Sequence, residues 1–249
     1  MRFCSLGSGS TGNAHLVEGP RGYVLVDAGF SWRGVRSRAR KAGIALDSVE
    51  AVILTHEHTD HVRGLGTLVR RGVPVYGSRG TLAALGLKGP KVHPLDGETE
   101  IAGLRVRSFS LPHDASDPRG LCISDGEGAV GIVTDLGSIT DAVLSGLRGC
   151  GVLLFEANHD PELLLAGRYP WHLKLRIMGP LGHLSNGEAG RALALLASRG
   201  VRAVLLAHIS RENNRPGLAL ETVARHLRDW DGSLYLTYPD RPSAVVEDG

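Results

Sequence analysis

The sequence lacks any apolar run near the ~20 residues needed to cross a membrane, so we expect no membrane span. Met1–Leu6 leads directly into a glycine-rich stretch without the apolar core of a signal peptide, and none is expected. The three cysteines, Cys4, Cys122 and Cys150, form no Cys-x-x-Cys pair, which argues against a disulfide framework. We expect reduced, mostly buried thiols and a cytoplasmic location.

Other absences limit the architecture. A net charge of +2 is small for a protein that binds nucleic acid through its whole surface, so any basic surface must be local. No internal repeat, low-complexity segment or linker-like break divides the 249 residues. Hydrophobic content of 42% and charged content of 22% are typical of a globular protein with a full core. Because strand-like and helix-like segments alternate throughout, we predict one layered α/β domain over residues 1–249.

The densest group of functional residues lies in Thr55–His61. Four side chains able to bind a metal follow the apolar run Ala51–Leu54, which is typical of a buried strand: His56, His58, Asp60 and His61. Imidazole and carboxylate groups are ligands of first-row metals such as zinc and manganese. The pattern His56-x-His58 directs two imidazoles to the same side of an extended chain. Asp60 and His61 turn towards a second possible metal position. With eleven histidines in the whole chain, a chance cluster is a poor explanation.

Polar residues also recur where other predicted strands end. The strands expected at 23–26, 104–110, 129–134, 151–155 and 201–207 lead to Asp27, His113, Asp135, Glu156 and His208. If these strand ends converge on one edge of a sheet, their side chains lie close together. The histidine loop with His113, Asp135 and His208 then offers seven ligands, enough for two metal ions.

This pattern resembles the metallo-β-lactamase fold superfamily over essentially the whole chain. The elements that carry the likeness are His56-x-His58-x-Asp60-His61, the lone His113, Asp135, and His208 after an apolar strand. The resemblance implies a four-layer αβ/βα sandwich with two divalent metal ions at one edge, zinc or manganese, with iron not excluded. It also implies the ligands: His56, His58 and His113 for one metal, Asp60, His61 and His208 for the other, and Asp135 as the bridge.

A narrower likeness comes from residues 6–13, 155–160, 182–186 and 208–214, which resemble the YycJ/WalJ-type branch associated with DNA exonuclease activity. It implies that His183 protonates the leaving oxygen, with Asp60 as the other catalytic residue. A histidine beside a helix N-terminus is well placed near an anion, and Ser185 with Glu188 fits a capping box there. A histidine that merely packs before the cap is the alternative.

Other residues are candidates for contacts with substrate or for orienting the ligands. The turn at 6–13 can expose N–H groups to an anion, or it can be a simple hairpin turn; it is not a Walker motif. In the segment 168–176, aromatic residues can stack on bases and basic residues can bind phosphates, although the aromatics can equally belong to the core. The substrate candidates are Ser10, Asn13, Arg168, Trp171, Lys174 and Asn213. The candidates for supporting the ligands are Asp27, Glu156 and His159.

The predicted function is hydrolysis of phosphodiester bonds by a dinuclear metal centre, most concretely 5′ to 3′ exonuclease activity on DNA. A small-molecule hydrolase acting on cyclic phosphodiesters, thioesters or lactones is the alternative. A non-catalytic nucleic-acid-binding protein is a third hypothesis, against which the complete ligand set argues. The lack of a cysteine ligand argues against β-lactam hydrolysis. The lack of a β-CASP insertion and of a long RNase Z arm argues against those nucleases and against processing of tRNA ends.

Overall fold

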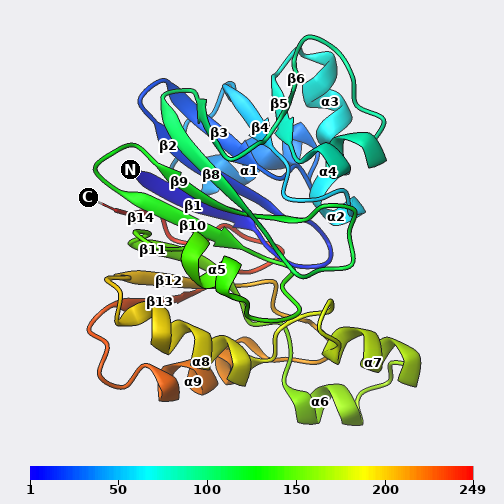
Figure 1. Ribbon diagram of the computed structural model, residues 1–249, viewed down its shortest axis with the longest axis vertical. Helices are drawn as coiled ribbons and strands as arrows, with labels where there is room; N and C mark the ends of the chain where they lie inside the picture. The colour runs from blue at the N-terminus through cyan, green and yellow to red at the C-terminus, as the bar shows by residue number, and fades with distance from the viewer. Residues whose placement is uncertain (249) are drawn as a thin grey trace.

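The computed structural model describes residues 1–248, which form two sheets that face one another (Figure 1). The first sheet has the strand order β14-β1-β2-β3-β4-β5-β6. Its strands are β1 (Arg2–Gly7), β2 (Ala14–Gly19), β3 (Gly22–Val26), β4 (Ala51–Ile53), β5 (Val75–Gly77), β6 (Val92–Pro94) and β14 (Val246–Glu247). The strands from β3 to β6 run parallel to one another, and the remaining pairs are antiparallel.

The second sheet has the order β13-β12-β11-β10-β9-β8-β7. Its strands are β7 (Glu98–Ile101), β8 (Leu104–Ser110), β9 (Arg119–Ser124), β10 (Ala129–Val133), β11 (Val152–Glu156), β12 (Ala203–Ala207) and β13 (Ser233–Leu236). The strands from β10 to β13 are parallel, and β8 has the same direction because two antiparallel pairings separate it from β10. β11 and β12 are buried along their whole length, which explains their continuous apolar runs.

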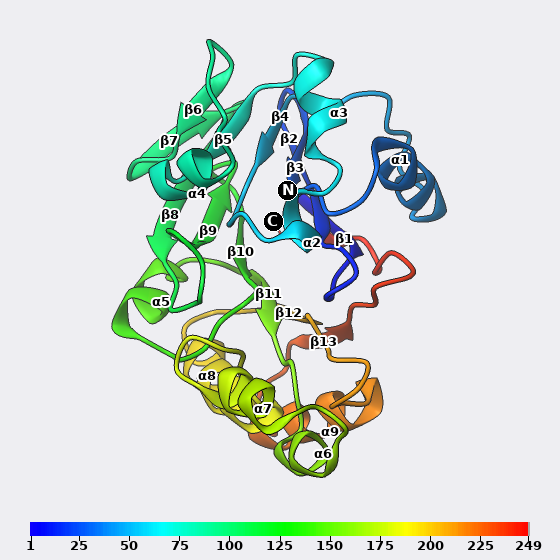
Figure 2. The same ribbon diagram turned by 90° about the vertical axis from the view of Figure 1, so that its right-hand side faces the viewer.

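Helices cover the outer faces of both sheets (Figures 1 and 2). Beside the first sheet lie α1 (Trp32–Lys41), α2 (Thr59–Val62), α3 (Leu65–Arg70) and α4 (Arg79–Ala84). Against the second lie α5 (Asp141–Gly146), α8 (Asn186–Ala197) and α9 (Pro216–His226), and α6 (Pro161–Ala166) with α7 (Trp171–Met178) forms a separate projection. No helix among residues 1–248 is both long and apolar enough to cross a membrane.

Three hydrophobic clusters separate the four layers. The middle cluster joins the two sheets, with Val24 and Ile53 on one side and Ile132 and Leu154 on the other. A second cluster packs α1 and α3 on the first sheet, and a third packs α5, α8 and α9 on the second. The predicted αβ/βα sandwich is therefore confirmed. The three cysteines are free and buried, as predicted.

Local sequence signals explain where the helices begin. Ser31 caps α1 by accepting a hydrogen bond from the Gly34 N–H, and basic residues in the last turn complement the helix dipole. Ser185 and Glu188 form the predicted capping box of α8. Two strands that the sequence patterns did not indicate, β1 and β14, pair with each other at one edge of the first sheet.

The parallel topology positions the functional residues. β3 and β4 end side by side, with Val26 opposite Ile53. In the second sheet, Val133, Phe155 and Leu206 lie opposite one another on β10, β11 and β12. The loops that follow these strands therefore leave the two sheets at one common edge, which faces the viewer in Figure 2 together with α2 and α7.

Candidate metal centre

The backbone bends sharply at three of the predicted site residues. Asp27, Asp135 and His208 each follow a strand by one or two residues, with φ values of 60°, 59° and 53°. Among residues 1–248, Ala102 is the only other non-glycine residue with positive φ. This conformation costs ~1–3 kcal/mol per residue and persists where the surroundings enforce it, often at functional sites. Here it turns each side chain into the space between the sheet ends.

Asp27 holds the beginning of the histidine loop. Its carboxylate is fully buried. Oδ1 accepts a hydrogen bond from the Thr55 N–H at 2.9 Å, and Oδ2 accepts one from the Thr55 hydroxyl at 2.9 Å. The carboxylate also lies 2.7 Å from Nδ1 of His61. Donation from Nδ1 to this carboxylate leaves Nε2 of His61 as the nitrogen with a lone pair for a metal ion, a common arrangement behind histidine ligands. The prediction that Asp27 supports the ligands agrees with this geometry.

The three histidines predicted to share a metal ion lie together. Ligand nitrogens of His56, His58 and His113 are all within 4.8 Å of one another. Nε2 of His113 lies 3.3 Å from Nδ1 of His58, and its Nδ1 lies 3.3 Å from the carbonyl oxygen of Gly182. Glu57, the remaining acidic residue of the loop, points elsewhere and accepts a hydrogen bond from the Ser116 N–H at 2.7 Å. It thereby ties the histidine loop to the loop that carries His113.

Asp135 lies between the two predicted sets of ligands. Its Oδ2 is 3.1 Å from Nε2 of His61, while its Oδ1 is 3.3 Å from Nδ1 of His208 and 3.9 Å from Nε2 of His113. Burial alone raises the pKa of Asp135, but the neighbouring histidines outweigh it and hold the pKa well below the ordinary value. Asp135 is therefore an anion that faces both sets, as a bridging ligand requires.

Glu156 organises two histidines at once. One carboxylate oxygen, Oε1, accepts hydrogen bonds from Nδ1 of His183 at 2.9 Å and from Nδ1 of His208 at 3.0 Å. The other, Oε2, accepts from the N–H groups of Leu136 at 2.8 Å and Leu184 at 3.1 Å. Although burial raises the pKa of Glu156, the two histidines lower it to about 2. This ionised carboxylate orients both His208, a predicted ligand, and His183.

Several buried atoms at the centre have no hydrogen-bond partner within residues 1–248. They include Nε2 of His56, Nε2 of His208 and Oδ2 of Asp135. A buried polar atom left without a partner destabilises a protein by ~1–3 kcal/mol, so a cluster of them calls for an explanation. Asp60, His61 and His208 also have ligand atoms within 4.8 Å of one another. Imidazole and carboxylate atoms that converge without partners fit divalent cations.

The glycine- and serine-rich loop after β1 contacts the predicted ligands. Ser8 Oγ accepts a hydrogen bond from the backbone N–H of His208 at 3.0 Å. The side-chain amide of Asn13 lies 2.9 Å from Nε2 of His61 and 3.2 Å from Oδ2 of Asp60. Asn13 is fully buried, so its predicted contact with substrate is replaced by a contact with the ligands. Neither the anion-binding nest nor the plain hairpin turn describes this loop well.

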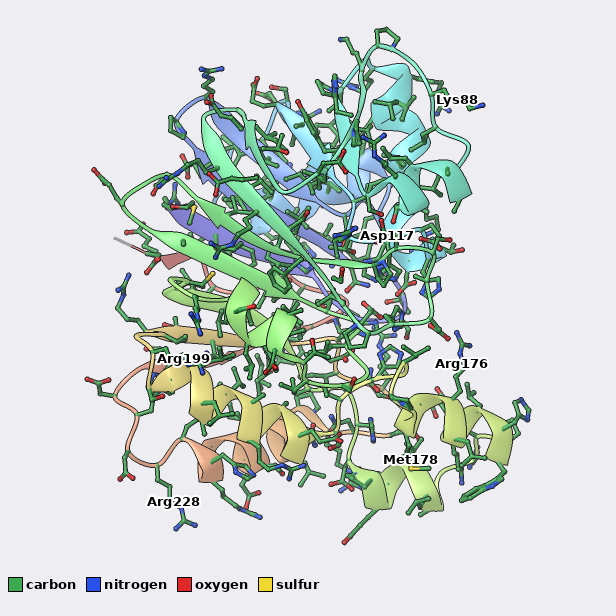
Figure 3. The ribbon with its side chains drawn as sticks, in the orientation of Figure 1. Lys88, Asp117, Arg176, Met178, Arg199 and Arg228 are labelled. Atoms are coloured by element: carbon green, nitrogen blue, oxygen red, sulfur yellow. The ribbon has the colours of Figure 1, made fainter. Side chains whose placement is uncertain are left out.

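A cavity of about 320 Å³ opens onto the predicted ligands. One side is formed by His58, Asp60, His113, Asp135, His183 and His208. The other side comes from Tyr169 and from the face of α7 that carries Leu173, Arg176 and Ile177. Figure 3 shows the Arg176 side chain extending from α7 towards the layers above it. Ser10 lines the cavity as well, as its predicted contact with substrate requires.

Comparison with known proteins identifies the family. The model of the family described as "Beta-lactamase superfamily domain" matches residues 23–209. The chain belongs to this superfamily. It is 34% identical over 238 residues to the exodeoxyribonuclease YycJ of Bacillus anthracis, with 92% of this chain and 90% of the relative covered. It is 31% identical over 263 residues to the exodeoxyribonuclease WalJ of Streptococcus pneumoniae, with 99% and 98% covered. The predicted YycJ/WalJ-type branch is thus confirmed.

A solved structure has the same fold. The metallo-β-lactamase fold protein YhfI from Bacillus subtilis superposes with a TM-score of 0.74 at 17% identity, over 100% of this chain and 98% of that one. At this identity the likeness concerns the fold alone. It agrees with the four-layer fold described above.

Two predicted contacts with substrate are placed elsewhere by the structure. Lys174 is buried and its ammonium group donates to the carbonyl oxygen of Leu165 at 2.5 Å. Asn213 is buried beside Ser210, whose hydroxyl accepts from its backbone N–H at 3.1 Å. The Lys174 ammonium group thus links α7 to α6, whereas Oδ1 of Asn213 is buried without a hydrogen-bond partner in the described part of the chain. Arg168 and Trp171 are exposed but do not line the cavity.

His159 also differs from the prediction that it supports the ligands. Its side chain is buried, and Nδ1 has no hydrogen-bond partner in the described part of the chain. Its backbone instead accepts a hydrogen bond from the Asn186 N–H at 2.8 Å and so anchors the start of α8. Its place after a strand resembles that of a ligand support, but its side chain makes no hydrogen bond to a predicted ligand.

Two asparagines that the sequence patterns did not single out hold the loops of the centre. Asn158 donates from its side-chain amide to the carbonyl oxygen of His208 at 2.8 Å. Asn214 donates to the carbonyl oxygens of Ala157 at 3.1 Å and of Asn158 at 2.9 Å. Their position in segments 155–160 and 208–214, just after apolar strands, was the available signal. An amide that follows a buried strand must find partners, and here those are the loop carbonyl groups.

Proposed function

We propose that the chain is a metal-dependent phosphodiesterase that removes nucleotides from an end of DNA, in the 5′ to 3′ direction. One observation carries the proposal: the predicted ligands for two cations converge, and five of them line the same cavity as His183, a histidine outside that set. Two relatives named as exodeoxyribonucleases, which align over almost the whole chain, support DNA as the substrate. The three free, buried thiols support a cytoplasmic location.

In this proposal the ligands divide into two sets. His56, His58 and His113 would hold one cation, while Asp60, His61 and His208 would hold the other. Asp135, which faces both sets, would be shared between them. Zinc and manganese suit these ligands, and iron suits them as well. When bound, two such cations activate a water molecule and stabilise the negative charge that develops on phosphate oxygens.

His183 is the proton donor in this proposal. Burial lowers the pKa of His183, but Glu156 and Asp135 outweigh burial and raise the pKa above its ordinary value. A raised pKa favours the doubly protonated imidazole, in which Nδ1 donates to Glu156 and the proton on Nε2 is available for transfer. During hydrolysis the oxygen of water joins phosphorus and the bond from phosphorus to the leaving oxygen breaks. The proton of His183 passes to the leaving oxygen, and Asp60 takes up the proton of water.

The test is a set of DNA and RNA strands, single and double, each labelled at either the 5′ or the 3′ end. With Mn²⁺ or Zn²⁺, the wild-type protein is expected to release label from the 5′ end of DNA first. Asp60→Asn is expected to slow this release by at least about a hundredfold, while circular dichroism remains that of a folded protein. The control, Asp229→Asn, removes an exposed carboxylate far from the ligands. Equal rates for Asp60→Asn and the wild type contradict the proposal.

The size of the cavity favours one further candidate. A volume of about 320 Å³ lies at the small end of the ~300–1,000 Å³ that is usual for small-molecule sites. A small-molecule hydrolase of cyclic phosphodiesters, thioesters or lactones therefore also fits the same centre. Turnover of a cyclic dinucleotide, combined with no binding or degradation of DNA at low salt, favours this candidate over the nuclease.

A further inference from the structure

α7 has two different sides. Leu173, Arg176 and Ile177 are three and four residues apart, so they share one face of the helix, and that face lines the cavity. Tyr169 extends this wall just before the helix begins. Trp171 lies on the other side and is 60% exposed. The helix thus contributes an apolar wall with one arginine to the cavity, and its aromatic N-terminal residue remains outside.

The two walls of the cavity have opposite chemistry. The wall formed by the strand ends carries the predicted metal ligands and His183, which suit a phosphate group. The α7 wall offers apolar and aromatic side chains, which suit the flat face of a base. The cavity is too small for a base pair with its two backbones, but it has room for one nucleotide. Its shape and chemistry therefore match one nucleotide whose phosphodiester bond reaches the ligands.

Arg176 is oriented by Asp114. Its Nε donates to Oδ2 of Asp114 at 2.6 Å, and Asp114 belongs to the same loop as His113. The two terminal nitrogens of the guanidinium group have no hydrogen-bond partner in the described part of the chain. Because Asp114 contacts only Nε, those two nitrogens stay available as a planar pair of donors. Such a pair matches the oxygens of a phosphate.

We propose that Tyr169, Leu173 and Ile177 hold the base of a single terminal nucleotide while Arg176, positioned by Asp114, binds a second phosphate one nucleotide from the scissile bond. This inference rests on the proposed phosphodiesterase function and adds to it how the end of the chain is recognised. Because the cavity takes one unpaired nucleotide, the terminal base pair must open before each cut. Each hydrolytic step then releases one mononucleotide and shortens the chain by one residue.

The first experiment isolates the second phosphate. Two deoxydinucleotides are compared, one with a 5′-terminal phosphate and one with a 5′-hydroxyl group, so that only the former carries a phosphate beside the scissile diester. For the wild type, kcat/KM is expected to be about ten- to a hundredfold higher with the phosphorylated dinucleotide, mainly through KM. In Arg176→Ala this ratio is expected to fall to about one, and in Arg176→Lys to an intermediate value.

The matched control is Arg228→Ala. Arg228 is also an exposed arginine, and Figure 3 shows it on the opposite side of the molecule from Arg176. Its loss changes the net charge equally, so the preference of this variant for the phosphorylated dinucleotide should equal that of the wild type. A preference that is equal in Arg176→Ala and the wild type overturns the role of Arg176 and leaves the phosphodiesterase function intact. Failure of the wild type to cleave any diester instead overturns the proposed function itself.

The second experiment tests the apolar wall. Tyr169→Ala is expected to raise KM for single-stranded DNA about five- to a hundredfold, as loss of a stacking aromatic does. Trp171→Ala removes a neighbouring aromatic that does not line the cavity, and KM is expected to stay within about twofold. The first product from 5′-labelled DNA should be the mononucleotide. First products of two or more nucleotides, or equal effects of the two aromatic substitutions, contradict a one-nucleotide subsite.

Discussion

The carboxylate of Glu156, the last residue of β11, lies 2.9 Å from Nδ1 of His183, which comes shortly before α8. The same oxygen also accepts a hydrogen bond from His208. One buried carboxylate therefore orients a predicted metal ligand and the predicted proton donor together. A change at Glu156 should disturb metal binding and proton transfer at once.

Glu156→Gln is expected to lower both metal content and rate. The amide cannot accept the same four hydrogen bonds as the carboxylate, and loss of a group that orients a ligand typically weakens metal affinity ~10- to 100-fold. Metal per chain after dialysis and the initial rate on DNA measure the two effects. Glu188→Gln is the control, because Glu188 is hydrogen-bonded in the capping box and does not contact the ligands. Full metal content in Glu156→Gln contradicts this role.

His183→Ala is expected to lower kcat by ~10²- to 10⁴-fold while metal content is retained, because a general acid is lost and a ligand is not. His159→Gln provides a comparison at a buried histidine whose Nδ1 has no hydrogen-bond partner in the described part of the chain. Its kcat should remain within a few-fold of the wild-type value. Steady-state rates and metal analysis on the same preparations distinguish the two. If His183→Ala loses its metal, the histidine is a ligand and the assignment is wrong.

Metal-free protein is expected to lose stability as pH rises. Burial lowers the pKa of His61, but Asp27 and Asp135 outweigh burial and raise it from 6.5 to about 10. A pKa raised in the folded state stabilises the protein fully below pH 6.5, and this contribution disappears as pH rises towards 10. Thermal unfolding with a chelator should therefore show a falling Tm between pH 7 and pH 10. With bound cations replacing the proton, the fall should be smaller; parallel curves contradict the prediction.

Gly29→Ala should disrupt the centre without touching a ligand side chain. A Cβ atom at Gly29 would lie 1.9 Å from the carbonyl oxygen of Asp60 and 2.5 Å from the backbone nitrogen of Asn13. Both atoms belong to backbone, so the loops must separate, at ~1–3 kcal/mol or more. Gly217→Ala in α9 is the control, because nothing lies within 4 Å and alanine favours a helix. Urea unfolding should show a lower midpoint for Gly29→Ala and an unchanged or higher one for Gly217→Ala.

The elements that the sequence predicts well are those with a local signal. The buried strands before Asp135, Glu156 and His208 are continuous apolar runs, and the capping box at Ser185 is a short motif. Each signal lies within a few residues, so the strands and the α8 N-terminus could be located without tertiary information. β14 has only two residues and depends on β1 for its pairing, so no local pattern indicates it.

The side chains that were predicted incorrectly are those whose direction depends on distant contacts. Asn13 turns to His61, 48 positions away, and Lys174 turns back to the carbonyl oxygen of Leu165. His159 follows a strand just as Asp135 does, yet only the latter has the positive φ that turns its side chain into the centre. Strand-end position is visible in the sequence, whereas side-chain direction is not.

The sequence by itself determined which side chains are candidates for the site: seven imidazole and carboxylate groups in segments that follow strands, because residue type and strand burial are properties of the local sequence. Tertiary structure decided how those groups work together. It placed Glu156 behind both His183 and His208, used Asn13 to hold the ligands, and brought the Arg176 face of α7 to the cavity. These relationships join residues that are far apart in the chain, and packing of the four layers alone brings them within hydrogen-bonding distance.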